Sequence, residues 1–155
     1  TQPFGRAATL SATAIDPELS RGKARAIINV LHHLPPTLAE SVLRDAVRSR
    51  APVFVAEGFE RDPRGFLPFA PFGLPALALS PILAPDRRFS RAFLVWGTPI
   101  ALLCSAWDGF VSTLRVYSEA ELRAMVGDDD GYSWHYGHYT WAPFGRGYYF
   151  FGVPT

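Results

Sequence analysis

The sequence predicts an α/β fold on three observations. Ala24–Leu31 and Pro52–Glu57 are short apolar runs with the length and the Ile and Val content of buried strands. Between them, from Thr37 onward, apolar residues recur at helical spacing and charged residues fall on the other face. The segments that connect the helix to the two strands are short. Two strands without alternating polarity, joined by an amphipathic helix, are typical of a parallel pair in an open α/β sheet.

The composition narrows the class of protein. The chain has 155 residues, the size of one domain, and a formal net charge of +1. Proteins that neutralise phosphates are usually strongly basic, so we expect no nucleic-acid partner. Hydrophobic residues make up 48% of the chain, which favours a folded domain. The single cysteine, Cys104, excludes an intramolecular disulfide and a multi-cysteine zinc site and fits a cytoplasmic setting.

Two helices have N-terminal signals. Thr37 followed by Glu40, and Ser118 followed by Glu121, each match the capping box, in which two side chains satisfy free backbone N–H groups. Gly127 is a natural stop for the second helix. We therefore expect helices that open at Thr37 and Ser118.

The C-terminal part predicts an antiparallel hairpin. Aromatic residues alternate with smaller or polar ones over Tyr132–Tyr139, as in a half-exposed strand. Tyr148–Val153 forms a second strand-like run. Gly145–Gly147 lies between the two, so we expect the chain to turn there.

Two uncharged stretches precede the last helix. Phe66–Pro85 has the length of a membrane span, but its five prolines would interrupt the backbone hydrogen bonds that a span requires. Phe93–Trp107 is shorter and contains Pro99. We expect both to form an insertion that is buried or covers a substrate, with Cys104 as a buried thiol. The alternative, which we favour less, is a face that contacts a membrane surface or a partner.

The chain therefore divides into three parts of one partial domain. Residues 9–65 hold the strand-helix-strand unit, residues 66–117 form the apolar insertion or lid, and residues 118–155 hold the last helix and the hairpin. No internal repeat and no heptad pattern is present.

Four segments resemble the back half of class I S-adenosylmethionine-dependent methyltransferases, which are Rossmann-like. They are ATAIDPEL, ARAIINVLHHLPP, PVFVAEGFER and WDGFVSTLRVYSEAEL, and the resemblance extends over residues 9–154. It implies a sheet of strand order 3-2-1-4-5-7-6 in which strand 7 is antiparallel. Ala24–Leu31 and Pro52–Glu57 would be strands 4 and 5, and the hairpin would supply strands 6 and 7.

The front half of that family's domain has no counterpart in this sequence. The glycine-rich loop after strand 1 and the acidic residue after strand 2, which hold the cofactor in the family, are absent. Strand 1 is the neighbour of strand 4 in the family, so Ala24–Leu31 would be an unpaired edge, which invites pairing with another chain. We expect either a fragment of a longer protein or a sheet completed by a partner chain or a second copy.

The resemblance places the chemistry at the carboxyl ends of the strands, where ligands bind in open α/β sheets. His32 and His33 follow strand 4, and we expect one of them to act as general base on the acceptor. Alternatively, one caps the strand end and the other packs under the proline turn. Asp16, with Ile15 and Asn29, is implied to contact S-adenosylmethionine, and a plain Asp-Pro turn is the alternative for Asp16. Adjacent histidines point in different directions, so we expect no metal site.

Three further residues are candidates for binding the acceptor. Glu57 ends the second strand and either contacts substrate or belongs to a solvated, ion-paired loop with Glu60, Arg61 and Arg64. Trp107 and Tyr117 would line a pocket for an apolar acceptor. We expect Asp108 to pair with Arg115 and to fix a loop over the site.

Two functions from different classes follow. The first is an enzyme that transfers a methyl group from S-adenosylmethionine to a small, apolar acceptor. The second is a non-catalytic, methyltransferase-derived subunit with a structural or interaction role in a larger assembly. The absent glycine-rich loop and the unpaired edge favour the second, because fold similarity does not establish activity.

Overall fold

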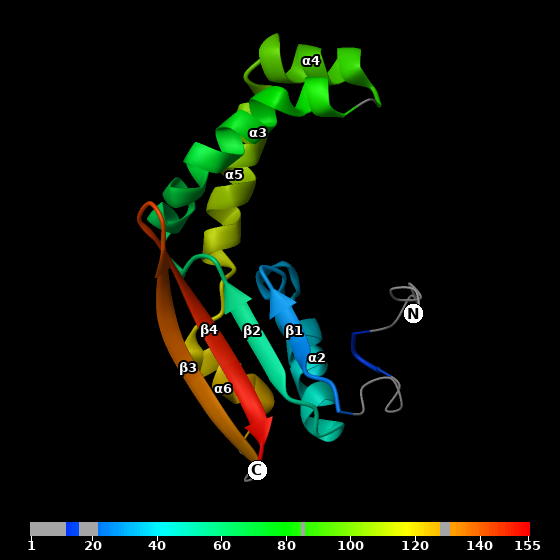
Figure 1. The fold of residues 1–155 in the computed structure, drawn as a ribbon, viewed down its shortest axis with the longest axis vertical. Coiled ribbons are helices and arrows are strands. Elements are labelled where there is room, and N and C mark those ends of the chain that lie inside the picture. The colour runs from blue at the N-terminus through cyan, green and yellow to red at the C-terminus, as the bar shows by residue number, and fades with distance from the viewer. Residues whose placement is uncertain (1–11, 16–21, 85, 128–130) are drawn as a thin grey trace, which may run out of the picture.

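A mixed four-stranded sheet organises the fold. The computed structural model describes residues 12–15, 22–84, 86–127 and 131–155 (Figure 1). The strands lie in the order β1-β2-β4-β3, with bounds β1 (Arg25–Ile28), β2 (Val53–Glu57), β3 (Tyr132–Trp141) and β4 (Gly145–Pro154). β1 and β2 are parallel, whereas β4 is antiparallel to both of its neighbours. Together with five helices in the described residues, the sheet confirms the predicted α/β class.

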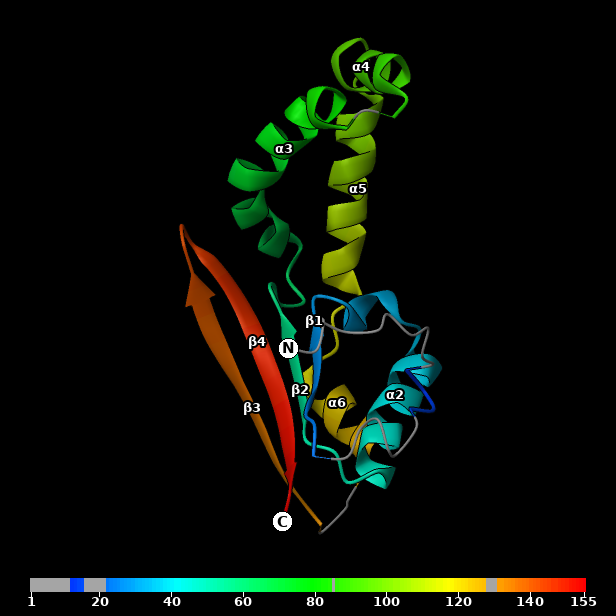
Figure 2. The ribbon, with the colours of Figure 1, turned by 45° about the vertical axis from the view of Figure 1, so that its right-hand side comes forward.

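Two helices cover one face of the sheet, and the hydrophobic core lies beneath them (Figure 2). They are α2 (Pro36–Arg48) and α6 (Glu119–Val126). Their inward side chains pack on alternate residues of β2 and β4, as the two-residue period of a strand requires. The largest fully buried apolar side chains are Tyr148, Phe150, Leu31, Leu43 and Leu122. The opposite face exposes Phe54 and Val153 and has no described helix over it.

β1 is shorter than the predicted strand Ala24–Leu31. It ends at Ile28 because Asn29 adopts a left-handed backbone conformation, with a φ of 53°, that turns the chain out of the sheet. Leu31–His33 then form a 3₁₀ turn, η1. On its outer side β1 has no neighbouring strand within the described part of the chain.

The two predicted capping boxes have different outcomes. The box at Ser118 is confirmed: its hydroxyl accepts a hydrogen bond from the N–H of Glu121, whose carboxylate accepts one from the N–H of Ser118. α6 ends at Gly127 as predicted. The box at Thr37 is wrong, because α2 begins at Pro36 without a side-chain cap. Proline is favoured at a first helical position, where its preset φ fits and a missing N–H costs no hydrogen bond.

The predicted hairpin is confirmed, but its turn lies earlier than expected. β3 and β4 pair along their whole length, so the chain turns at residues 142–144 and not at Gly145–Gly147. Gly145 and Gly147 lie within β4, at positions where neighbouring groups leave no space for a side chain. A Cβ on Gly147 would collide with the backbone oxygen of Glu57 and with the ring of Tyr139.

The apolar insertion forms a helical extension that rises from the carboxyl ends of β1 and β2 (Figure 1). The extension consists of η2 (Pro63–Phe69), α3 (Ala70–Leu83), α4 (Arg88–Trp96) and α5 (Ile100–Leu114). The expectation that prolines interrupt this stretch is wrong for α3, which contains Pro75 and Pro81. Each proline removes one N–H donor, but the remaining backbone hydrogen bonds keep α3 continuous across Pro75 and Pro81.

Most of the helical extension is exposed, so the expectation of a buried insertion is also wrong. Its base packs on the sheet through Phe69, whose ring centroid lies 4.7 Å from that of Trp141 at the end of β3. Cys104 on α5 is exposed and is not a buried thiol. Pro63–Leu83 is long and apolar enough to cross a membrane, and α4 with α5 would qualify only as a pair bent by 77°.

Candidate functional site

Asn29 ties together the carboxyl ends of β1 and β2. Its backbone N–H donates to the carbonyl of Ala56 at 2.9 Å, and its side-chain oxygen accepts from the N–H of Gly58 at 2.6 Å. Glycine is required at position 58 because a Cβ there would press on the ring of Phe69 and the Asn29 amide. The residues that follow the two strands are therefore held at one edge of the sheet.

His32 and Glu57 form a buried pair at this edge. The imidazole Nδ1 of His32 lies 2.7 Å from Oε2 of Glu57, and the backbone N–H of His32 donates to Oε1 at 3.2 Å. His32 is 4% exposed and Glu57 is 0% exposed. Both carboxylate oxygens are thus held by one residue. This satisfies a buried charged group that would otherwise be costly, and it fixes the imidazole ring in place.

The pair also sets the tautomer of His32. A carboxylate only accepts hydrogen bonds, so Nδ1 carries the shared proton. In the neutral imidazole with its proton on Nδ1, Nε2 has the lone pair that a general base needs. The rings of His33 and Phe59 lie against His32, with centroids 4.0 and 5.1 Å from it. His33 is exposed, and no described group hydrogen-bonds to its ring.

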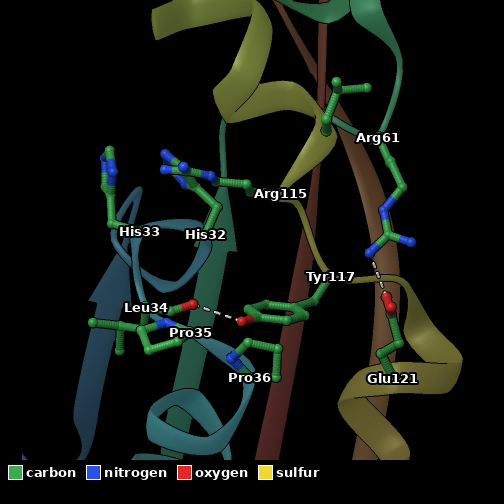
Figure 3. Close-up of a pocket in the computed structure, with 10 residues that line it drawn as sticks. His32, His33, Leu34, Pro35, Pro36, Arg61, Arg115, Tyr117 and Glu121 are labelled. Carbon is green, nitrogen blue, oxygen red and sulfur yellow. Dashed lines mark hydrogen bonds and ion pairs between the residues drawn. The ribbon is translucent and has the colours of Figure 1, made fainter.

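Both histidines line a cavity of about 450 Å³ (Figure 3). Figure 3 shows the two imidazoles rising from one turn above the ring of Tyr117. The Tyr117 hydroxyl donates to the carbonyl of Leu34 at 2.6 Å and so holds that wall in place. The remaining lining residues are Pro35, Pro36, Arg61, Leu114, Arg115 and Glu121. The cavity combines apolar walls, a base and charged groups.

The two arginines of this cavity have different partners. Arg61 forms an ion pair with Glu121 at 2.6 Å, and its Nε donates to the carbonyl of Val116. Arg115 has no ion-pair partner among the described residues. Its guanidinium is therefore available to an anionic group of a ligand.

A second cavity, of about 280 Å³, separates the site from the base of the helical extension. Its walls come from both parts of the molecule: Asn29, His32, His33 and Phe59 on one side, and Phe66, Phe69, Ser105, Asp108, Gly109 and Ser112 on the other. His32 borders both cavities. The base of the extension is thus part of the wall of the site.

Burial shifts the pKa of several groups near the cavities. It raises the pKa of Tyr117, and it raises that of Tyr148 strongly, with Glu57 adding to the shift. Both phenols therefore stay protonated at neutral pH. The Tyr148 hydroxyl is buried without a hydrogen-bond partner among the described residues. The pKa of Glu121 is lowered, chiefly by the hydrogen bond from the backbone N–H of Ser118.

Five of the predicted site residues come together. His32, His33 and Asn29 follow β1, Glu57 ends β2, and Tyr117 lies between α5 and α6. For Glu57 the solvated loop is wrong, because this residue is fully buried against His32. It lines neither cavity, and its contact with substrate stays a prediction. The other members of the expected loop pair elsewhere, Arg61 with Glu121, Arg64 with Asp62, and Glu60 with His138 and Arg146.

Of the residues implied to hold the cofactor, Asn29 lies at the site and Ile15 does not. The backbone N–H of Ile15 donates to Asp45, which also binds Arg25 at the first position of β1. Ile15 therefore lies toward the end of β1 opposite from His32. Asp16 lies outside the described residues. The side-chain oxygen of Asn29 is already used by Gly58.

The expected loop held by an ion pair between Asp108 and Arg115 is wrong, because the segment is the helix α5. Trp107 is exposed on this helix and lines neither cavity, and its contact with an acceptor stays a prediction. Asp108 lies on the same helix and borders the second cavity, and it forms no ion pair with Arg115.

Sequence reasoning missed the contact between His32 and Glu57. The available signal was positional: both residues follow or end neighbouring parallel strands, and the carboxyl ends of such strands meet at one edge. No comparable signal identified Arg115, whose place depends on how α5 leaves the sheet.

The fold and the site define an α/β domain with a buried histidine–carboxylate pair at the carboxyl edge of two parallel strands. Comparison with protein-family models, with curated proteins and with solved structures finds no match for the chain.

Proposed function

We propose that this chain forms the acceptor-binding half of a class I S-adenosylmethionine-dependent methyltransferase that acts on a small acceptor with an apolar part and an anionic group. The strand order is the observation that carries the proposal. The order β1-β2-β4-β3, with β4 reversed, is the order 4-5-7-6 that the resemblance implies for these segments. Many α/β sheets contain a parallel pair, but a hairpin inserted with its second strand inward is a more specific feature.

The residues of the site supply a base and a place for the acceptor. Nε2 of His32 takes the proton of the acceptor's nucleophilic atom, and Glu57 orients the imidazole and stabilises the imidazolium that results. The apolar walls near Tyr117 and Leu114 select an apolar body, and Arg115 binds an anionic group. Glu57 acts only through His32 and is therefore a positioning residue.

The described residues do not complete a site for S-adenosylmethionine. Ile15 lies toward the far end of β1, and the sequence has no glycine-rich loop. Donor binding would therefore require residues beyond those described, such as a strand added to the free edge of β1. A cytoplasmic setting remains a prediction.

The free edge of β1 favours the second candidate, a non-catalytic interaction subunit. An apolar groove of about 450 Å³ runs along this edge and is lined by Ala26, Ile28, Val30 and Val42, among others. A partner strand would fill it and satisfy the backbone groups of β1. In the enzyme, the cofactor-binding half would occupy the same edge.

Methyl transfer separates the two candidates. The protein is purified together with the chain segment or partner that completes the donor site. It is then incubated with S-[methyl-³H]adenosylmethionine and a membrane-lipid extract, and label is counted in the organic phase. We expect transfer by the wild type and a loss of about 10²- to 10⁴-fold in kcat for His32→Ala. For Glu57→Gln we expect a smaller loss and a changed pH profile, because the ring loses its anionic partner.

His135→Ala is the matched control. His135 is an exposed histidine on β3 that stacks on Phe151, away from both cavities. Its replacement should leave transfer unchanged. A wild type that neither binds S-adenosylmethionine nor transfers label rejects the enzyme, and full activity of His32→Ala rejects the assigned base.

A further inference from the structure

The helical extension exposes an unusual amount of apolar surface. Among the described residues, 22 large apolar side chains are exposed, and sixteen of them lie between residues 67 and 114. The most exposed are Phe89 (90%), Leu83 (71%), Trp107 (68%), Phe93 (65%), Leu103 (62%) and Phe72 (60%). Within the span-length segment Pro63–Leu83, only 11% of its apolar 18-residue window is buried. Continuous patches of this kind mark a surface that is covered by another component.

The charges of the extension are concentrated at its tip. No Asp, Glu, Lys or Arg occurs in residues 66–85 or in residues 92–107. Between these stretches lie Asp86 and three exposed arginines, Arg87, Arg88 and Arg91. α4, which begins at Arg88, is amphipathic, with arginines toward one side and Phe89, Phe93 and Trp96 toward another.

We propose that the helical extension inserts into an anionic phospholipid bilayer, with α3 and the apolar part of α5 among the acyl chains and the tip arginines at lipid phosphates. α3 is apolar on all sides, with no polar stripe that would face water beside a protein partner. Lipid chains surround a helix, whereas a protein partner covers one face of it.

The lengths and the composition fit a bilayer. η2 and α3 together run over 21 residues, about 35 Å at the usual rises of 3₁₀ and α-helices, against an acyl layer of about 30 Å. Helical backbone satisfies its own hydrogen bonds, which lipid requires. Tryptophan is enriched at membrane interfaces, and the extension has two exposed tryptophans, Trp96 and Trp107. Trp96 also joins α4 to α3, because its indole N–H donates to the carbonyl of Ala78.

Membrane insertion would also determine where the candidate site lies relative to the bilayer. The second cavity lies at the base of the extension, so His32 would sit where the bilayer meets water. If the proposed function holds, the acceptor reaches His32 from the lipid phase, and Arg115 binds its anionic headgroup. This consequence rests on the proposed function, whereas insertion itself does not.

Vesicle flotation tests the insertion without any cofactor. The purified protein is mixed with vesicles of phosphatidylcholine, with or without phosphatidylglycerol, and centrifuged through a density gradient. We expect the wild type to float with both and more strongly with the anionic vesicles. The double variant Phe89→Glu/Phe93→Glu should lose at least about tenfold in partitioning, because each charge is costly in the acyl layer.

Two further variants make the result specific. Val153→Glu places the same charge on an exposed apolar position of β4, at the end of the sheet opposite from the extension, and should float like the wild type. Replacing Arg87, Arg88 and Arg91 by glutamine keeps the apolar surface and should reduce only the preference for anionic vesicles, by about fivefold per arginine. Circular dichroism verifies that each variant is folded.

Two results would overturn the proposal. One is a folded wild type that does not float and instead sediments as a dimer that Phe89→Glu/Phe93→Glu dissociates, because a second copy would then cover the extension. The other is an equal loss of flotation in the Val153→Glu control. Neither outcome depends on methyl transfer, so this test and that of the proposed function fail independently.

Discussion

Two regions of the molecule contain apolar helices, but only one region buries the apolar side chains. The first region is the sheet with α2 and α6, and the second is the helical extension. α2 buries Ala39, Val42, Leu43 and Ala46 and turns its charged residues outward. α3 buries only Pro81 and has no charged face. Apolar content alone therefore does not predict burial within a protein. A polar face at the period of the element is what indicates that the other side packs on a core.

The largest contrast is expected between leucines of the two regions. Leu43→Ala removes a fully buried side chain and should lower the free energy of unfolding by about 3–5 kcal/mol through lost contacts and a cavity. Leu103→Ala, on exposed α5, should change it by less than about 0.5 kcal/mol. Urea unfolding followed by circular dichroism measures both. Equal effects would mean that α5 is packed in a core.

The next largest effect concerns the buried pair. Glu57→Ala leaves the ring and the backbone N–H of His32 without an acceptor and should cost about 2–3 kcal/mol. Glu60→Ala is the matched control, because its ion pairs with His138 and Arg146 are partly exposed and contribute less than about 1 kcal/mol. Chemical denaturation of both variants gives the comparison, and a Glu57 effect as small as that of Glu60 would contradict a buried, fully bonded pair.

Tyr117 connects the two regions at the cavity wall. Tyr117→Phe removes the hydrogen bond to the Leu34 carbonyl and should cost about 1 kcal/mol while keeping the ring in place. Thermal unfolding measures this loss. A variant as stable as the wild type would show that the hydroxyl does not hold the wall.

The smallest expected effect depends on pH. The pKa of Glu121 is lowered in the folded chain, so its contribution to stability is present above its ordinary pKa of 4.5 and is lost as the pH falls through the lower folded value. Glu121→Gln should be about 0.5 kcal/mol less stable than the wild type at pH 7, since solvent screens the half-exposed pair with Arg61. The difference should shrink as the pH falls below 4.5 and the Glu121 carboxylate takes up its proton. A difference that grows in acid would reverse the assigned sign.

The predictable part of the fold follows from local patterns. The two strands, the Ser118 cap and the hairpin each have a signal within a few residues, and the structure confirms each of them. The strand end at Asn29 could not be predicted, because it depends on a bond to Gly58 that forms only when β1 and β2 are paired. The direction of α5, and with it the exposure of Trp107, depends on packing at the base of the extension.

The sequence was sufficient to identify some residues of the candidate site, but it did not predict which residues they contact. His32 was identified from its place after a strand, but its pairing with Glu57 joins residues 25 positions apart. Arg115 enters the cavity only because the chain between α5 and α6 passes beside η1. Such contacts are set by tertiary structure, for which a single sequence has no local signal.

The most direct test of the contrast between the two regions uses Cys104, the single cysteine, which is exposed on α5. A nitroxide attached there reports, by power-saturation electron paramagnetic resonance, its accessibility to oxygen and to a water-soluble nickel chelate. On adding anionic vesicles, accessibility to oxygen should rise and accessibility to the chelate should fall, because α5 enters the acyl layer. An unchanged spectrum with full access to the chelate would contradict the central claim that this apolar surface faces lipid.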